Sequence, residues 1–389
     1  MKYNAILIFL LIITFQVARA AEEENEINPF IKLDKNKLFQ PVLDLEFWYV
    51  YSMNEKQSGE EVYDRSDAMF RRVRIGAKGN PTPWLNYIFR FSADRVGEDV
   101  YTAVKGSYNG ISVWNGYFTI KPLSDKNLLN IHMGYFWTGV SREFTNSPWN
   151  VASLDKTRSN YYLRHFVSGK GNGIESGIAL GGIKNFNKCA ISYRTGVYEP
   201  SAYSCSNYGN KLFTGRAVLT IGDGEQSKYS YMVPANNWRK TKSISIGLGG
   251  SSQQNGKLCD SVLFKTSYTY GADLLVCYKG IRLEGECFAM KREDQAKQKI
   301  DAITWYARAS YNFIIANKYI EAVVCYDSYD ASGNKSVYKF IGDDNSLDMG
   351  LNWYLSKDKL KLALHYIIQD GTTSPNLGNY IGTALQFRL

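Results

Sequence analysis

The sequence predicts an all-β fold, a transmembrane antiparallel β-barrel of about sixteen strands. From residue 41 to the last residue, apolar and polar residues alternate nearly continuously, with the period of two that a strand requires. Aromatic residues, which fit pleated surfaces, are abundant: the chain holds 29 Tyr, 19 Phe and 8 Trp. After residue 20 no apolar run approaches the roughly 18–20 residues that a membrane helix needs.

The N-terminus has the pattern of a secretory signal peptide. Residues 1–20 combine a basic start, an apolar run over residues 5–15 and the small-x-small cleavage pattern Ala18-Arg19-Ala20. The apolar run is too short for an uncleaved membrane anchor. We expect residues 21–40 to form an extended N-terminal segment and residues 41–389 to form the barrel domain.

The expected mature chain is exported and mildly basic. Without Lys2 and Arg19 it contains 44 basic and 37 acidic residues, a net charge of +7. Basic patches can indicate binding to nucleic acid, but an exported chain makes that partner improbable. Membrane lipid is the partner that a transmembrane barrel implies.

Sixteen stretches have the alternating pattern. They cover residues 41–53, 68–79, 84–95, 111–122, 128–137, 173–184, 187–199, 210–222, 240–251, 260–278, 280–291, 301–315, 318–328, 345–355, 359–369 and 379–389. Longer polar connections alternate with short turns, and they cover residues 54–67, 96–110, 138–172, 200–209, 292–300, 329–344 and 370–378. Outer-membrane barrels show this rhythm, with turns on one rim and loops on the other. Residues 223–239 are too long for a turn in this scheme, and residues 252–259 are short for a loop.

The clearest hairpin is Tyr268–Glu286, which folds back at Lys279-Gly280. On its first arm one face is apolar, and the opposite face carries Asp273 and Lys279. A soluble sandwich would bury the apolar face, whereas a membrane barrel turns it towards lipid. The alternation of apolar and polar residues alone does not distinguish a soluble sandwich from a membrane barrel. The signal peptide, the strand number, the loop rhythm and the amphipathic final strand together favour the barrel.

Charged residues of the strands follow the polar phase. Those with this phase include Arg72, Arg74, Lys78, Arg90, Arg194, Arg216, Arg282, Arg308, Lys361 and Arg388. A charge at the lipid midplane would cost about 2–4 kcal/mol, so a barrel requires this partition. Arg71 is the exception, and we place it near a strand end, where its head group can reach water.

Several short motifs resemble the phosphate-selective porin O and P family. They are Phe70–Gly79 (FRRVRIGAKG), Tyr268–Glu286 with YGAD, YKG and LEGE, Trp305–Tyr311, and Gly350–Tyr354 (GLNWY). The resemblance is diffuse and spans residues 41–389. The chain ends in Phe387-Arg388-Leu389, where such porins usually end in an aromatic residue.

This resemblance implies a sixteen-stranded, homotrimeric channel of the bacterial outer membrane. It also implies that the third external loop, here residues 138–172, folds into the lumen as a constriction. In such porins, arginines of the lumen guide small anionic solutes towards a narrowing lined by lysine and arginine.

The charges of the expected lumen agree with an anion preference. Residues 138–172 carry five basic residues against Glu143 and Asp155, and Arg72, Arg74 and Arg90 lie on neighbouring strands. Arginine suits phosphate and carboxylate because its planar fork donates two parallel hydrogen bonds. The predicted pore-lining and anion-binding residues are Arg72, Arg74, Lys78, Arg90, Arg142, Lys156, Arg158 and Arg164.

Acidic residues share the same inward phase, which argues against a dedicated phosphate site. They are Asp44, Glu46, Asp94, Asp273, Glu284, Glu286, Glu321, Asp327 and Asp348. Some are expected to pair with lumen arginines, for example Arg282 with Glu284 or Glu286. Each basic residue of the set can equally be an ordinary solvated charge. The mixed lumen therefore favours general, weakly anion-preferring diffusion.

An enzymatic function and a cofactor are not expected. His132, His165 and His365 are scattered without metal-ligand spacing, and no nucleophile motif adjoins them. Six cysteines also lack such spacing, and a disulfide between Cys205 and Cys259 is one option among free thiols.

We therefore predict an outer-membrane porin for passive diffusion of small hydrophilic solutes, with a preference for phosphate or other small anions. The alternative is a non-conducting barrel that acts as an adhesin or surface scaffold. A soluble secreted β-protein is the third reading of the pattern.

Overall fold

The computed structural model describes residues 38–57, 60–94, 96–97, 110–123, 127–202, 210–226, 228–230, 238–258, 261–357, 359–373 and 379–389. The expected signal peptide, most of the expected N-terminal segment, Cys205 and Cys259 lie outside these residues. Cys189, Cys277, Cys287 and Cys325 are free thiols. Within the described ranges, no helix is both long and apolar enough to cross a membrane.

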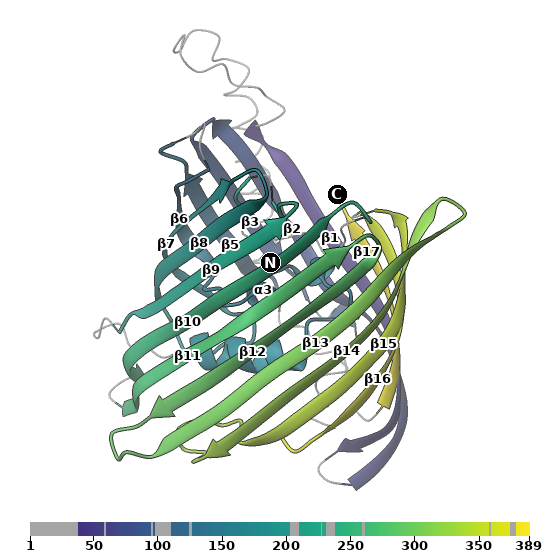
Figure 1. The fold of residues 1–389 in the computed structure, drawn as a ribbon. Coiled ribbons are helices and arrows are strands. Elements are labelled where there is room, and N and C mark those ends of the chain that lie inside the picture. The colour runs from purple at the N-terminus through teal and green to yellow at the C-terminus, as the bar shows by residue number, and fades with distance from the viewer. Residues whose placement is uncertain are drawn as a thin grey trace, which may run out of the picture.

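The described strands close into an antiparallel barrel (Figure 1). Its strands are β1 (Gln40–Gln57), β2 (Glu60–Thr82), β3 (Leu85–Ser92), β4 (Val96–Gly97), β5 (Ser112–Ile120), β6 (Asn130–Trp137), β7 (Ile174–Asn185), β8 (Cys189–Glu199), β9 (Leu212–Gly222), β10 (Lys242–Leu258), β11 (Ser261–Tyr278), β12 (Ile281–Glu293), β13 (Lys299–Ile315), β14 (Lys318–Gly333), β15 (Gly342–Ser356), β16 (Leu360–Gly371) and β17 (Asn379–Arg388). β1 pairs with both β2 and β17, which closes the ring. Because β4 has only two residues, sixteen long strands remain, and the predicted fold is confirmed.

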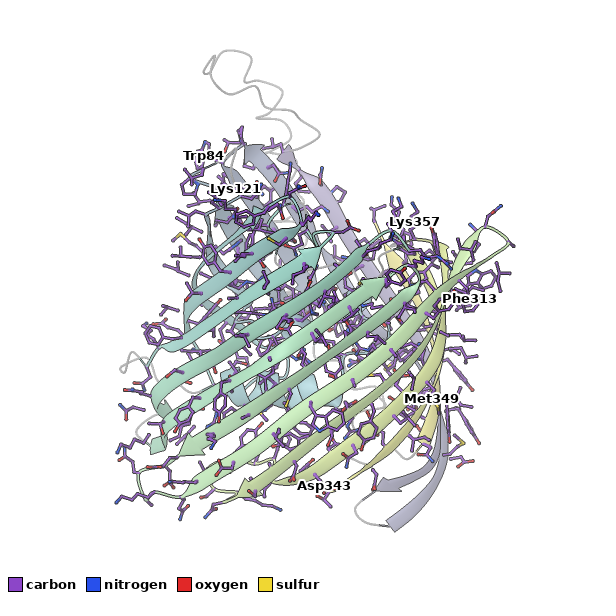
Figure 2. All side chains as sticks on the ribbon, in the orientation of Figure 1. Trp84, Lys121, Phe313, Asp343, Met349 and Lys357 are labelled. Carbon is purple, nitrogen blue, oxygen red and sulfur yellow. The ribbon has the colours of Figure 1, made fainter. Side chains whose placement is uncertain are left out.

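The apolar face of the strands points outwards. On β11, Tyr270, Leu274 and Tyr278 are 53%, 44% and 50% exposed, while Asp273 between them is 3% exposed. Met349 of β15 likewise lies on the outer surface (Figure 2). Closure leaves no open edge among the described strands, as a lipid environment requires. The barrel is therefore built to face lipid outside and water inside.

Several strands run further than predicted at the rim of the long loops. β1 and β2 continue as a paired hairpin through most of residues 54–67, and Lys56 still pairs with Glu61. The hairpin projects beyond the neighbouring strands in Figure 1. β10 and β11 similarly extend through most of residues 252–259. The loop predictions for these two segments were wrong. Apolar and polar residues alternate only where the barrel faces lipid, whereas backbone pairing between strands continues beyond it without an apolar face.

A β-bulge on β2 reverses the expected orientation of Arg71. Glu46 pairs with Arg72 and Phe47 pairs with Phe70, so Arg71 is the extra residue between them. The bulge lets Arg71 and Arg72 both reach Asp155 inside the barrel. The placement of Arg71 near a strand end was therefore wrong, because it lies well within β2.

The segment between β6 and β7 lies inside the lumen, and we call residues 138–172 the third loop. It contains α3 (Arg142–Thr145), the 3₁₀ turn η1 (Pro148–Asn150) and α4 (Arg158–Ser168). Thr157 caps the start of α4 by accepting a hydrogen bond from the Asn160 N–H, 3.2 Å away. Gly169 ends the helix at φ 78°, in the left-handed region that suits glycine.

One face of α4 holds the helix against the barrel wall. Tyr162, Leu163, Phe166 and Val167 are buried in a cluster with side chains of β12, β13 and β14. The ring of Tyr162 stacks on Tyr329, with 3.9 Å between centroids. Apolar packing thus fixes the orientation of α4 and leaves its other face towards the lumen.

The described part of residues 223–239 also enters the lumen, from the rim of the short turns. Glu225 accepts two hydrogen bonds from Arg142 of the third loop, at 2.7 and 3.0 Å. Tyr229 contacts β8, where Arg194 donates to its hydroxyl at 3.2 Å. Between this segment and the third loop a gap of about 40 Å³ remains. The described part of this connection therefore occupies part of the interior.

Candidate functional site beside the third loop

A cavity of about 740 Å³ separates the third loop from the barrel wall, and we call it the L3 cavity. Its walls come from residues 148–172 and from inward side chains of β2, β5 and β14–β17. Its described basic residues are Arg71, Arg72, Arg74, Lys156, Arg158, Arg164 and Lys170. Its described acidic residues are Asp94, Asp155, Asp327 and Asp348. Cations therefore outnumber carboxylates around this space.

The structure brings five of the eight predicted site residues to the L3 cavity: Arg72, Arg74, Lys156, Arg158 and Arg164. The other three lie elsewhere. Lys78 is exposed near the end of β2. Arg90 donates to Asn115 at 2.9 Å and lies 3.4 Å from a carboxylate oxygen of Asp44.

Arg142 belongs to the smaller gap on the opposite side of the third loop. Its guanidinium pairs with Glu225 at 2.7 Å and with Asp273 at 3.1 Å. Arg216 pairs with the same Asp273 at 2.7 Å. Two carboxylates thus engage Arg142, which fastens the start of the third loop to the wall and to the 223–230 segment.

Five of the described cations of the L3 cavity have carboxylate partners, namely Arg71, Arg72, Arg74, Arg158 and Lys170. Arg72 pairs with Glu46 of β1 and with Asp155 of the third loop. Arg158 donates to Asp344 through Nε at 2.8 Å. Burial alone would raise the pKa of the Asp155 carboxyl, but the charges of Arg72 and Arg71 outweigh burial and hold that pKa well below its ordinary value.

Arg74 pairs with Asp94, and its guanidinium lies over the Trp114 ring, 3.7 Å from the centroid. This contact is a cation–π interaction, which keeps the head group beside the cavity without neutralising it.

Lys156 and Arg164 have no carboxylate partner within 4.0 Å among the described residues. The Lys156 amine donates to the carbonyls of Glu143 and Phe144, at 2.7 and 3.2 Å. Arg164 donates through Nε to the Asn160 carbonyl at 3.3 Å. Burial and the nearby Arg164 lower the pKa of Lys156 well below its ordinary value, and burial lowers the pKa of Arg164 to about 10.

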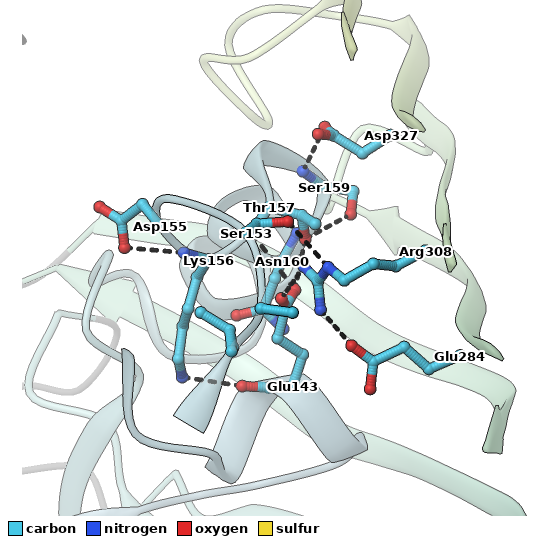
Figure 3. Close-up of polar contacts among 12 residues, drawn as sticks. Glu143, Ser153, Asp155, Lys156, Thr157, Ser159, Asn160, Glu284, Arg308 and Asp327 are labelled. Atoms are coloured by element: carbon cyan, nitrogen blue, oxygen red, sulfur yellow. Dashed lines mark hydrogen bonds and ion pairs between the residues drawn. The ribbon is translucent and has the colours of Figure 1, made fainter. Parts of the chain in front are cut away.

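Acidic residues take part in the contacts that hold the third loop against the barrel wall (Figure 3). Arg308 of β13 donates to Glu143 at 2.7 Å and to Ser153 at 2.8 Å, and it also pairs with Glu284. Asp327 of β14 accepts the Ser159 N–H at 3.2 Å. Glu143 and Glu284 are thereby paired with Arg308, whereas Asp327 accepts a neutral donor and also lines the L3 cavity.

The predicted pair between Arg282 and Glu284 is confirmed, at 2.6 Å. Sequence reasoning missed three participants. Arg71 was missed because the bulge turns its side chain inwards. Two adjacent arginines in an alternating strand are a signal that the inward and outward positions shift by one residue there. Glu225 lies in a segment whose unusual length was visible. Tyr161 lines the cavity at 39% exposure, but nothing in its sequence context separates it from the buried Tyr162.

The family profile of the phosphate-selective porins O and P matches residues 43–389. Comparison with curated proteins gives no match. Among solved structures, the fold is similar to OprB of Pseudomonas putida, with TM-score 0.58, 10% identity, and coverage of 91% of this chain and 95% of that one. It is also similar to an anion-selective porin from Comamonas acidovorans, with TM-score 0.56, 13% identity, and coverage of 90% and 98%. A loop-deletion mutant of OmpT from Vibrio cholerae has TM-score 0.52, 10% identity, and coverage of 90% and 99%. Because the profile covers nearly the whole barrel domain, the chain belongs to the phosphate-selective porin O and P family, whose members are outer-membrane porins.

Proposed function

We propose that this porin passes small hydrophilic solutes through the L3 cavity and prefers anions. The observation that carries the proposal is the pair Lys156 and Arg164, two cations without a carboxylate within 4.0 Å among the described residues. Charges that line a narrow pore set its ion preference, because they lower the barrier for the opposite sign. The family name and the anion-selective structural neighbour support the same sign.

The proposed preference is general and not specific for phosphate. Arg72, Arg74 and Arg158 each pair with a carboxylate, which keeps them from forming a continuous ladder of free donors. A small anion would therefore meet two unneutralised head groups beside the third loop. In this proposal the short turns face the periplasm and the long connections face the outside, as in outer-membrane barrels. The predicted homotrimer and the cleaved signal peptide stay predictions.

Single-channel recording of the refolded protein in a planar bilayer tests the proposal. Under a KCl gradient the reversal potential should favour chloride, and Arg164→Gln should reduce that preference. Lys291→Gln is the matched control, because Lys291 is exposed at 46% on β12 and does not line the cavity. Unselective steps in the wild type, or equal effects of the two variants, would refute the anion preference.

The runner-up function is a non-conducting surface scaffold. It draws support from the 223–230 segment and the third loop, which together leave a gap of only about 40 Å³ on their side of the lumen. If the protein is folded and inserted but shows no conductance steps, the scaffold function would replace the porin function.

A further inference from the structure

The open face of α4 carries an alternation of cation and aromatic ring. Arg158, Tyr161, Arg164 and His165 are its partly or fully exposed residues, and the others are buried. The first three line the L3 cavity. Residues three apart are neighbours on a helix surface, so Tyr161 lies between the two arginines. With a rise of 1.5 Å per residue, the row from Arg158 to Arg164 spans about 9 Å along the helix axis.

The Tyr161 ring is a fixed platform. It approaches Gly171 so closely that a Cβ added there would lie 2.6 Å from its Cε2 atom. On another side it meets Phe340 edge-on, at 5.9 Å between centroids. Yet the residue is 39% exposed, and the exposed part faces the cavity. An aromatic ring that is held in one orientation and partly exposed offers a stacking position for a flat solute.

The two arginines of the row differ in their availability. Arg158 donates to Asp344 at 2.8 Å through Nε, so its charge is already compensated. Arg164 has only the Asn160 carbonyl at 3.3 Å as a hydrogen-bond partner, with no ion pair among the described residues. A carboxylate is the group that a planar guanidinium binds best, through two parallel hydrogen bonds. Arg164 therefore lies next to a partly exposed aromatic ring.

The cavity is large enough for an organic solute. Its volume of about 740 Å³ falls within the range of roughly 300–1,000 Å³ found for small-molecule sites. Inorganic phosphate would leave both the space and the aromatic ring unused. We propose that the Tyr161–Arg164 pair is a subsite for aromatic carboxylates, in which the solute ring stacks on Tyr161 and its carboxylate binds Arg164. This inference rests on the proposed anion-preferring pore and names the class of anion that dwells there.

The test compares benzoate with cyclohexanecarboxylate, which has equal charge and carbon number but no flat ring. Each is added to single channels of the wild type, Tyr161→Phe, Tyr161→Ala and Tyr270→Ala. Tyr270 is the matched control because it is 53% exposed on the lipid-facing side of β11. Benzoate should block current at a concentration about two- to tenfold lower than cyclohexanecarboxylate, as stacking of aromatic pairs predicts. Tyr161→Phe and Tyr270→Ala should keep this difference, and Tyr161→Ala should abolish it.

Equal block by the two acids in the wild type, or a difference that survives in Tyr161→Ala, would overturn the subsite. The reversal potential in the same bilayers measures the general anion preference separately, so either proposal can fail alone. Saturation-transfer NMR on the detergent-solubilised protein gives a second measurement without current. There the benzoate ring signal should weaken in Tyr161→Ala and persist in Tyr270→Ala, and an unchanged signal in Tyr161→Ala would refute stacking.

Discussion

Asp155→Asn should make the pore more anion-selective, because it removes a carboxylate from the L3 cavity while preserving the shape of the side chain. Asp155 pairs with Arg72 and with Arg71, the latter at 3.2 Å. Its Oδ1 also accepts the Lys156 N–H at 2.7 Å, and an asparagine oxygen can keep that bond. Arg72 retains Glu46, so the third loop should stay in place.

The size of the effect follows from Coulomb's law. A unit charge about 4 Å from a passing ion contributes about 1 kcal/mol even at the dielectric constant of bulk water. That energy corresponds to roughly a fivefold change in ion partitioning, since about 1.4 kcal/mol is tenfold. Because the same energy raises chloride partitioning and lowers potassium partitioning, we expect the chloride-to-potassium permeability ratio to rise by up to about 25-fold at low salt. Screening over a Debye length of about 3 Å at 1 M should shrink the gain there.

The assay is the reversal potential in a planar bilayer under a KCl gradient, at low and at high ionic strength. Asp301→Asn is the matched control, because Asp301 is 59% exposed on β13 and does not line the cavity. An increase confined to Asp155→Asn and largest at low salt is the expected result. An unchanged ratio, or the same change in both variants, would show that ions do not pass beside Asp155.

Three further predictions concern the packing and titration of the lumen. Glu225→Gln should destabilise the barrel, because it breaks the buried ion pair with Arg142 and such a loss costs about 3–5 kcal/mol. The folded band on gels should then be lost at a lower temperature. An unchanged transition temperature would show that this ion pair does not stabilise the fold. Gly249→Ala should alter single-channel conductance, since its Cβ would overlap the carbonyl oxygen of Val140 in the third loop, whereas Gly215→Ala has open space and should not. The anion preference should fall as pH rises through the lowered pKa of Lys156, below the ordinary value of about 10.4, because the amine then loses its charge. Lys156→Met should remove that pH dependence, and a variant that still showed it would rule out Lys156 as the titrating group.

The barrel itself could be predicted from the sequence because one physical constraint acts on every strand. Lipid outside and water inside force the alternation that residues 41–389 display. The closing pair of β1 with β17 needs a strand at each end of the barrel domain. The strand extensions at the rim could not be predicted, because no such constraint acts on them. Beyond the lipid, backbone pairing such as Lys56 with Glu61 continues without any apolar pattern to announce it.

The site was predicted in part, since residue type alone does not show which charges are paired. Arg142 and Arg164 lie in the same loop and are the same kind of residue in the sequence. One is held by Glu225 and Asp273, which come from segments far along the chain, and the other has no carboxylate within reach among the described residues. Long-range pairing of this kind depends on the register of the barrel and on the path of the third loop.

This difference decides how the ion preference of the lumen arises. Counting residues of the inward phase suggests a mixed interior in which acidic and basic groups cancel. The structure instead uses carboxylates such as Glu143 and Asp327 to hold the third loop through Arg308 and the Ser159 N–H. Glu143 is thereby paired with Arg308, whereas Lys156 and Arg164 donate to carbonyl oxygens and have no carboxylate within 4.0 Å among the described residues. We therefore expect the proposed preference for anions to depend on which cations the fold leaves without a carboxylate. A variant that frees or removes one such cation should change selectivity more than the same charge change at the rim.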